Sequence, residues 1–199
     1  GMWRTIYILP YAMPAFISLL VFRLMFNGIG PINNMLVNFG IERIPFFTDP
    51  ILAKISVLAI NTWVGAPYFM VLLSGSLTNI SSTLYEAAEI DGATKMQQFK
   101  HITLPMLLFQ TAPVLILSFA YNFNNFGAIY LLTDGNPVNS NLKFAGETDI
   151  LVTWLYKLTV NQQQFGMAAV ISIVLFAFIA TVSLYNFRKS KSFTEEDMI

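Results

Sequence analysis

The sequence contains no cysteine and only one histidine among its 199 residues. Without cysteine, the chain can form neither a disulfide framework nor a thiolate metal site. One histidine cannot supply a histidine cluster, and we interpret His101 as a solvated loop residue. The sequence therefore predicts no metal site.

Charged residues are scarce as well. They make up 11% of the chain, whereas 55% of residues are hydrophobic and the mean hydropathy is +0.60. An ordinary soluble domain carries about 25% charged residues, so this composition predicts a membrane protein in contact with lipid. The 11 Lys and Arg balance the 11 Asp and Glu, which leaves no basic surplus for a nucleic-acid partner.

The long apolar runs lack carboxylates in their middle. All 11 Asp and Glu lie in loops, predicted helix ends, one polar stretch or the C-terminal tail. An ion-coupled carrier needs an ionisable group inside the membrane, and an intramembrane enzyme needs a catalytic pair. The sequence therefore argues against a secondary transporter and predicts that the chain is not an enzyme.

The sequence also lacks the Gly-x-x-x-x-Gly-Lys-Ser/Thr loop that cradles ATP phosphates. We therefore expect no cofactor here and ATP bound only by a partner chain.

Four apolar runs are long enough to cross a bilayer, which requires about 20 residues. They predict an all-α, polytopic membrane helical bundle with about four transmembrane helices. Two shorter amphipathic segments predict helices at the membrane surface, one opened by Pro31 and closed by Gly40. Prolines in the first run are expected to bend it. The predicted crossings cover residues 5–26, 51–78, 105–131 and 165–187, and the second surface helix covers residues 150–158. Asp49 and Pro50 fit the cap and the first residue of the second crossing.

A polar, charged stretch at residues 86–105 separates the second and third predicted crossings; we call it the polar island. Thr83 with Glu86, and Thr94 with Gln97, fit two capping boxes, and Gly92 fits a left-handed turn between two short helices. Two short helices alone cannot bury the apolar side chains of this stretch. This favours docking of a partner protein on them. The alternative is an ordinary turn between two membrane helices.

The island has a characteristic order: Glu-Ala-Ala, three residues, Gly, nine residues, then Ile-x-Leu-Pro. This order resembles the EAA loop of the permease subunits of bacterial ABC importers. In that family the loop is a cytoplasmic elbow that docks into the ATPase subunit. The resemblance implies that residues 83–105 are the coupling loop, with the family positions at Glu86, Ala87, Ala88, Gly92, Ile102, Leu104 and Pro105.

The resemblance also implies partners and a location. A cytoplasmic dimer of ABC ATPase subunits, a second permease subunit and an extracytoplasmic sugar-binding protein are expected, in a bacterial cell membrane. Residues 1–199 would form the C-terminal portion of a permease domain whose first helices lie upstream. The cluster of Arg188, Lys189 and Lys191 favours a cytoplasmic C-terminus, on the same side as the island.

Uncharged polar residues recur at the spacing i, i+4, i+7 on two predicted crossings. Asn61, Gly65 and Tyr68 share one helical face, and Ser118, Asn122 and Asn125 share another, with Tyr121 beside them. Amides that donate and accept, together with aromatic rings, suit a neutral, hydroxyl-rich ligand. The alternative is hydrogen bonding between helices that holds the bundle together.

The stretches NTWVGAPYFM (61–70) and SFAYNFNNF (118–126) resemble the larger permease subunit of maltose/maltodextrin importers, and the likeness extends over nearly the whole chain. That family has a phenylalanine at Tyr121 and a tyrosine at Ala66, so the preferred sugar length stays open. Other neutral solutes, such as another oligosaccharide or glycerol phosphate, remain the alternative substrates. The sugar-contacting positions implied by the resemblance are Asn61, Val64, Gly65, Tyr68, Ser118, Tyr121, Asn122 and Asn125.

Overall fold

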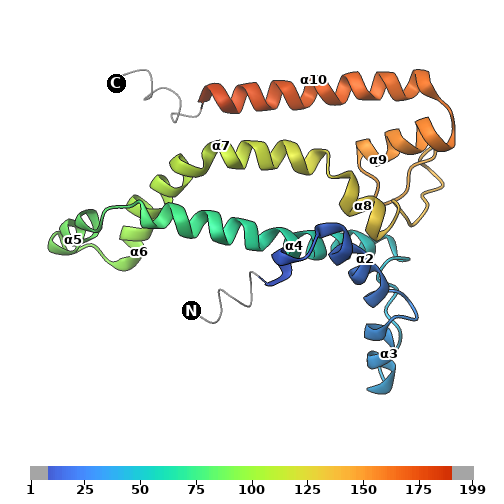
Figure 1. The fold of residues 1–199 in the computed structure, drawn as a ribbon, viewed down its shortest axis with the longest axis horizontal. Helices are drawn as coiled ribbons and strands as arrows, with labels where there is room; N and C mark the ends of the chain where they lie inside the picture. The colour runs from blue at the N-terminus through green and yellow to red at the C-terminus, as the bar shows by residue number, and fades with distance from the viewer. Residues whose placement is uncertain (1–8, 190–199) are drawn as a thin grey trace. The chain divides into compact units, whose positions relative to one another are not determined.

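The computed structural model describes residues 9–189 (Figure 1), and within them it is built from helices without any extended strand. The described residues fall into two compact units. The first comprises residues 9–67 and 122–178, and the second comprises residues 68–121 and 179–189. The all-α prediction is therefore confirmed, whereas the C-terminal tail lies outside the described residues.

Three helices in the described part of the chain have the length and composition needed to cross a membrane. The first is α4 (Pro50–Thr78), and the last is α10 (Phe165–Lys189), as the sequence predicted. Asp49 opens α4 as expected, because its Oδ1 accepts hydrogen bonds from the amides of Ile51 at 3.0 Å and Leu52 at 2.8 Å.

The remaining long helix differs from the predicted crossing at both ends. It begins before Pro105, because α6 (Lys95–Gln98) continues through the π-turn η2 (Phe99–Thr103) into α7 (Leu104–Phe123). Proline lacks an amide hydrogen, and the wider bonding of a π-turn just before Pro105 allows the helix to pass it. The prediction that Pro105 starts a new helix was therefore wrong.

At its other end this helix stops at Phe123, not near residue 131. Asn125 takes a non-helical conformation, and its side chain accepts a hydrogen bond from the amide of Ala128 at 3.3 Å. Such side-chain capping competes with the continuation of a helix. A separate short helix, α8 (Phe126–Leu132), follows.

The first predicted crossing is broken in the described residues. It consists of η1 (Leu9–Ala12) and α2 (Ala15–Met25), and α2 is only 11 residues long. Pro14 precedes α2 in an extended conformation. Because proline disfavours the helical region for the residue before it, the expected bend is a full interruption. Residues 5–8 of that prediction lie outside the described part.

The core of the first unit lies where α2, α4 and α8 meet. Its buried residues are Leu19, Val57, Ile60, Ile129 and Leu132. Arg23 of α2 adds a polar link by donating to the backbone carbonyl of Leu131 at 3.3 Å. This core holds the middle of α4 beside the start of α8, which places the polar residues described below.

Helices form in both of the shorter amphipathic segments. α3 (Pro31–Asn38) is followed by Gly40 with a positive φ of 76°, and α9 (Leu151–Tyr156) continues as the π-turn η3 (Lys157–Asn161). The polar island begins inside α5 (Ser82–Ile90) and continues into α6.

Candidate functional site

The turn between α5 and α6 is formed as the sequence predicted. Gly92 has φ +75°, and the amide of Ala93 donates to the carbonyl of Ala88 at 2.8 Å. A Cβ at Gly92 would meet no atom within 4 Å, so only the backbone conformation favours glycine here. The turn lies between the two short helices α5 and α6, and we call residues 83–105 the elbow.

The two predicted capping boxes had different outcomes. Thr94 and Gln97 form one: the Thr94 amide donates to Gln97 Oε1 at 2.8 Å, and the Gln97 amide donates to Thr94 Oγ1 at 3.3 Å. The box at Thr83 was wrong, because Ser81 caps α5 and accepts from the Thr83 amide. Ser81 takes the extended cap conformation, which leaves Thr83 inside the first turn.

The inner side of the elbow encloses a shallow cavity of about 320 Å³. Its polar groups come mainly from Asp91, Gln97, Gln98 and His101. Three of the residues implied by the resemblance, Ala88, Gly92 and Ile102, belong to its lining, whereas Glu86, Ala87, Leu104 and Pro105 do not.

An ion pair and a hydrogen bond stiffen the elbow. Lys95 pairs with Glu89, and this hydrogen bond, with the positive charge of Lys95, lowers the pKa of the Glu89 carboxyl. The stabilising effect is thus present at neutral pH and is lost as the pH falls through that lowered pKa. The Tyr85 hydroxyl bonds the Thr103 hydroxyl at 2.8 Å and joins α5 to η2. The side chains of Ile90 and Met96 remain 87% and 73% exposed. The elbow therefore presents apolar side chains on a backbone held by these two interactions.

In the first unit, three of the predicted sugar-contacting residues are joined by hydrogen bonds. Asn61 of α4 donates from Nδ2 to Asn122 Oδ1 at 3.3 Å, and Asn125 donates from Nδ2 to Asn61 Oδ1 at 3.0 Å. We call Asn61, Asn122 and Asn125 the amide cluster. Asn61 is more than 60 positions from the other two in the sequence, so the middle of α4 and the α7–α8 junction converge here.

The other predicted sugar-contacting residues are distributed over both units. Val64 packs against the core of the first unit, and Gly65 has open space around its Cα. Tyr68, Ser118 and Tyr121 belong to the second unit. Tyr68 and Tyr121 are 41% and 68% exposed, so both rings are accessible.

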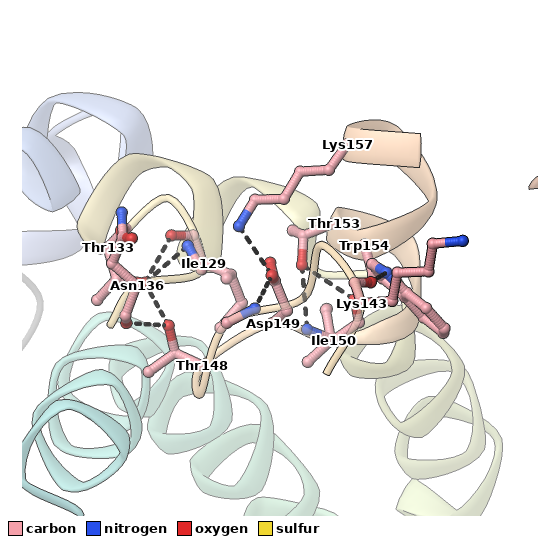
Figure 2. Close-up of polar contacts among 12 residues, drawn as sticks. Ile129, Thr133, Asn136, Lys143, Thr148, Asp149, Ile150, Thr153, Trp154 and Lys157 are labelled. Atoms are coloured by element: carbon pink, nitrogen blue, oxygen red, sulfur yellow. Dashed lines mark hydrogen bonds and ion pairs between the residues drawn. The ribbon is translucent and has the colours of Figure 1, made fainter. Parts of the chain in front are cut away.

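The polar loop after α8 contains a structure that the sequence did not predict (Figure 2). Thr133 and Thr148 share a hydrogen bond of 2.7 Å, and Thr148 also donates to the Asn136 carbonyl at 2.7 Å. Asp149, whose side chain is only 2% exposed, pairs with Lys157 at 2.8 Å. We call this network the loop clasp. No sequence rule pairs a loop aspartate with a lysine eight positions later.

No group of three or more metal-ligating His, Asp or Glu side chains occurs within the described residues 9–189.

Comparison with known proteins then identifies the family. Residues 1–191 match the family described as binding-protein-dependent transport system inner membrane component. The chain belongs to this family. It is therefore an integral membrane protein of the transport permease class, in agreement with its three membrane-length helices.

Curated relatives support the resemblance to sugar permeases. The galactooligosaccharides transport system permease protein GanP of Bacillus subtilis is 42% identical over 98% of this chain and 47% of its own length. The maltodextrin transport system permease protein MdxF of the same organism is 42% identical over 99% of this chain and 47% of its own. MalF of Vibrio vulnificus, a maltose/maltodextrin permease, is 45% identical over 96% of this chain and 38% of its own. The chain spans half or less of these relatives' length.

Solved structures give the same result for the fold. A bacterial ABC transporter involved in the import of the acidic polysaccharide alginate matches with a TM-score of 0.80 and 26% identity, over 97% of this chain and 66% of that chain. The alginate transporter in complex with an alginate pentasaccharide-bound periplasmic protein matches with a TM-score of 0.76, over 93% of this chain.

Proposed function

We propose that the chain forms part of the membrane pathway of an ABC importer for maltodextrin-type sugars and does no covalent chemistry itself. The relatives' names support a carbohydrate substrate, since they include maltose, maltodextrin, galactooligosaccharides and alginate. The observation that carries the proposal on this chain is the amide cluster, because Asn61 meets Asn122 and Asn125 although it is distant from both in the sequence.

The chemistry of the cluster suits sugar hydroxyl groups. Each amide offers two donor hydrogens and one acceptor oxygen, and the hydrogen bonds among the three asparagines can be exchanged for bonds to a hydroxyl. Asn125 also caps α8, since its Oδ1 accepts from the Ala128 amide while its Nδ2 donates to Asn61. Asn122, an exposed side chain at the end of α7, is the best candidate for direct contact. Val64, Gly65, Tyr68, Ser118 and Tyr121 complete the proposed sugar-contacting set.

Energy for transport would enter at the elbow, residues 83–105, docked on a cytoplasmic ATPase subunit. A rigid elbow suits this role, because movement of the ATPase subunit is transmitted by rigid, packed elements and not by mobile loops. The unbroken helix from Lys95 to Phe123 supports the proposal, since it connects the elbow directly to the membrane span that leads to Asn122. A second permease subunit, a second ATPase subunit and an extracytoplasmic binding protein complete the proposed importer.

The first prediction tests the amide cluster. Asn122→Leu removes donors and an acceptor that a sugar hydroxyl would use, a loss of roughly 1 to 3 kcal/mol, so sugar uptake should fall about tenfold or more. Uptake of labelled maltotriose is measured in proteoliposomes that hold the whole importer, at matched amounts of assembled complex.

Asn186→Leu on α10 is the matched control, because among the described residues Asn186 bonds only the Val182 carbonyl of its own helix. It should leave uptake near the unmodified rate. If Asn122→Leu transports as well as Asn186→Leu, or if it lowers only the amount of assembled complex, the asparagines hold helices together and do not contact sugar.

A further inference from the structure

The segment between α2 and α4 carries an unusual uncharged surface. Residues 28–41 contain no charged side chain and no histidine. Within them Ile29, Met35, Phe39 and Ile41 are exposed, at 74%, 59%, 75% and 50%. Met35 and Phe39 stand four residues apart on one face of α3 and its C-cap. We call residues 28–41 the α3 segment.

The α3 segment is not a loosely attached loop. Asn33 is fully buried, and its Nδ2 donates to the carbonyls of Asn27 at 3.1 Å and Ile44 at 2.9 Å. Its Oδ1 accepts from the Ile44 amide at 2.8 Å. Both donor hydrogens and the oxygen of this buried amide thus bond to the chain on either side of α3, which fixes the helix against the return segment at residues 41–46.

The return segment is in turn attached to the first turns of α4. The Ser56 hydroxyl donates to the Phe46 carbonyl at 3.3 Å, and the Phe46 ring packs edge-on against Phe26, with centroids 4.9 Å apart. Ser56 lies six residues after Pro50, which is about 9 Å along a helix that rises ~1.5 Å per residue. The return segment therefore lies beside the membrane helix, not beyond its end.

These attachments place the α3 segment beside the first turns of α4. In Figure 1, α3 runs across the direction of the first half of α4, and both belong to the first unit. Leu24 of α2 and Ile51 of α4, on the helices before and after the segment, are each 68% exposed as well. The nearest charges, Glu42 and Arg43, follow the segment directly.

We propose that the α3 segment lies in the lipid interface, with Ile29, Met35 and Phe39 inserted among the acyl chains next to the head groups. An interfacial helix buries its apolar face roughly 5 to 10 Å into this boundary. Lipid is the favoured occupant because α3 runs across the first half of the membrane-length helix α4, as a helix lying in the plane of the interface would.

The absence of cysteine from the chain allows a direct test. Met35→Cys, carrying a nitroxide spin label, is prepared in the full permease, assembled with its partner subunits after their own cysteines are replaced, in nanodiscs of phosphatidylethanolamine and phosphatidylglycerol. Collision rates of the label are measured with oxygen, which concentrates in lipid, and with a neutral nickel chelate, which stays in water. Asn141→Cys, in an exposed polar loop, is the water reference, and Phe176→Cys, 74% exposed on α10, is the lipid reference.

We expect the ratio of oxygen to nickel collisions at Met35 to be several-fold higher than at Asn141 and lower than at Phe176. A ratio equal to that at Asn141 would place the segment in water and overturn the proposal. Low collision rates with both reagents would mean that protein covers this face, which also overturns it.

A second measurement keeps the proposal testable if labelling disturbs assembly. A benzophenone side chain is introduced at Phe39 by amber suppression and activated by light in the assembled complex. Lipid adducts of the permease support the proposal, and adducts with a partner subunit contradict it. Neither result depends on sugar transport, so this inference and the proposed function can fail separately.

Discussion

At the scale of single residues, Gly92 sets the geometry of the elbow. Its φ of +75° lies in the left-handed region, where an L-residue pays about 1 to 2 kcal/mol. There is open space around its Cα, so a larger side chain would not clash, and the cost of substitution comes from the backbone alone.

We therefore expect Gly92→Val to reduce sugar-stimulated ATP hydrolysis by the assembled importer, because the elbow would be misdirected while the amide cluster is unchanged. Gly75→Val is the matched control: Gly75 also has open space around it, but it lies within α4 without a positive φ. If both variants hydrolyse ATP like the unmodified complex, the elbow does not carry the coupling.

Two lysines of the first unit allow the loop clasp to be tested by a pair of matched substitutions. Lys157 pairs with Asp149, whose side chain is 2% exposed, whereas Lys54 pairs with Glu147 and is itself 50% exposed. Removing the partner of a buried charge typically costs about 3 to 5 kcal/mol, and breaking an exposed pair costs about 0 to 1 kcal/mol.

Lys157→Met should thus lower the thermal unfolding midpoint of the purified complex clearly, and Lys54→Met should barely change it. Differential scanning fluorimetry in detergent measures both. Equal midpoints for the two variants would mean that the Asp149–Lys157 pair does not stabilise the loop.

At the scale of elements, the sequence predicted the helices better than their ends. Gly92, Thr94 with Gln97, and Asp49 were predicted correctly because each follows a local rule that depends on a few neighbouring residues. The start of α5 was placed wrongly because Ser81 and Thr83 both fit a cap, and only the observed conformation of Ser81 decides between them. The π-turn before Pro105 and the end of α7 just before Asn125 have no comparable sequence signal.

The cap of α5 gives a prediction at this scale. Ser81→Ala removes the side chain that accepts from the Thr83 amide, which should destabilise the first turn of α5 by about 0.5 to 2 kcal/mol. Hydrogen exchange of the peptide that covers residues 82–90 should speed up in the assembled complex. Thr83→Ala, which keeps the Ser81 acceptor, should have the smaller effect, and the reverse order would restore Thr83 as the cap.

At the scale of the whole molecule, the sequence established the membrane class, the expected family and most membrane helices. The i, i+4, i+7 spacing correctly placed Ser118 and Asn122 on one helix, but Asn125 lies beyond the end of α7 at Phe123, and the convergence of Asn122 and Asn125 with Asn61 did not follow from the spacing. Their direct hydrogen bonds could not be predicted, because they depend on how α4 packs against the α7–α8 junction. The loop clasp could not be predicted either, since its contacts join loop residues without periodicity.

The central claim is that sugar crosses the membrane beside the amide cluster only when ATP is hydrolysed by a partner docked on the elbow. The most direct measurement is uptake of labelled maltotriose into proteoliposomes that contain the full permease, its second permease subunit, the ATPase subunits and the binding protein. We expect uptake that requires ATP and is abolished when the ATPase subunits are catalytically inactive. Uptake that continues at the same rate without ATP hydrolysis would contradict the claim.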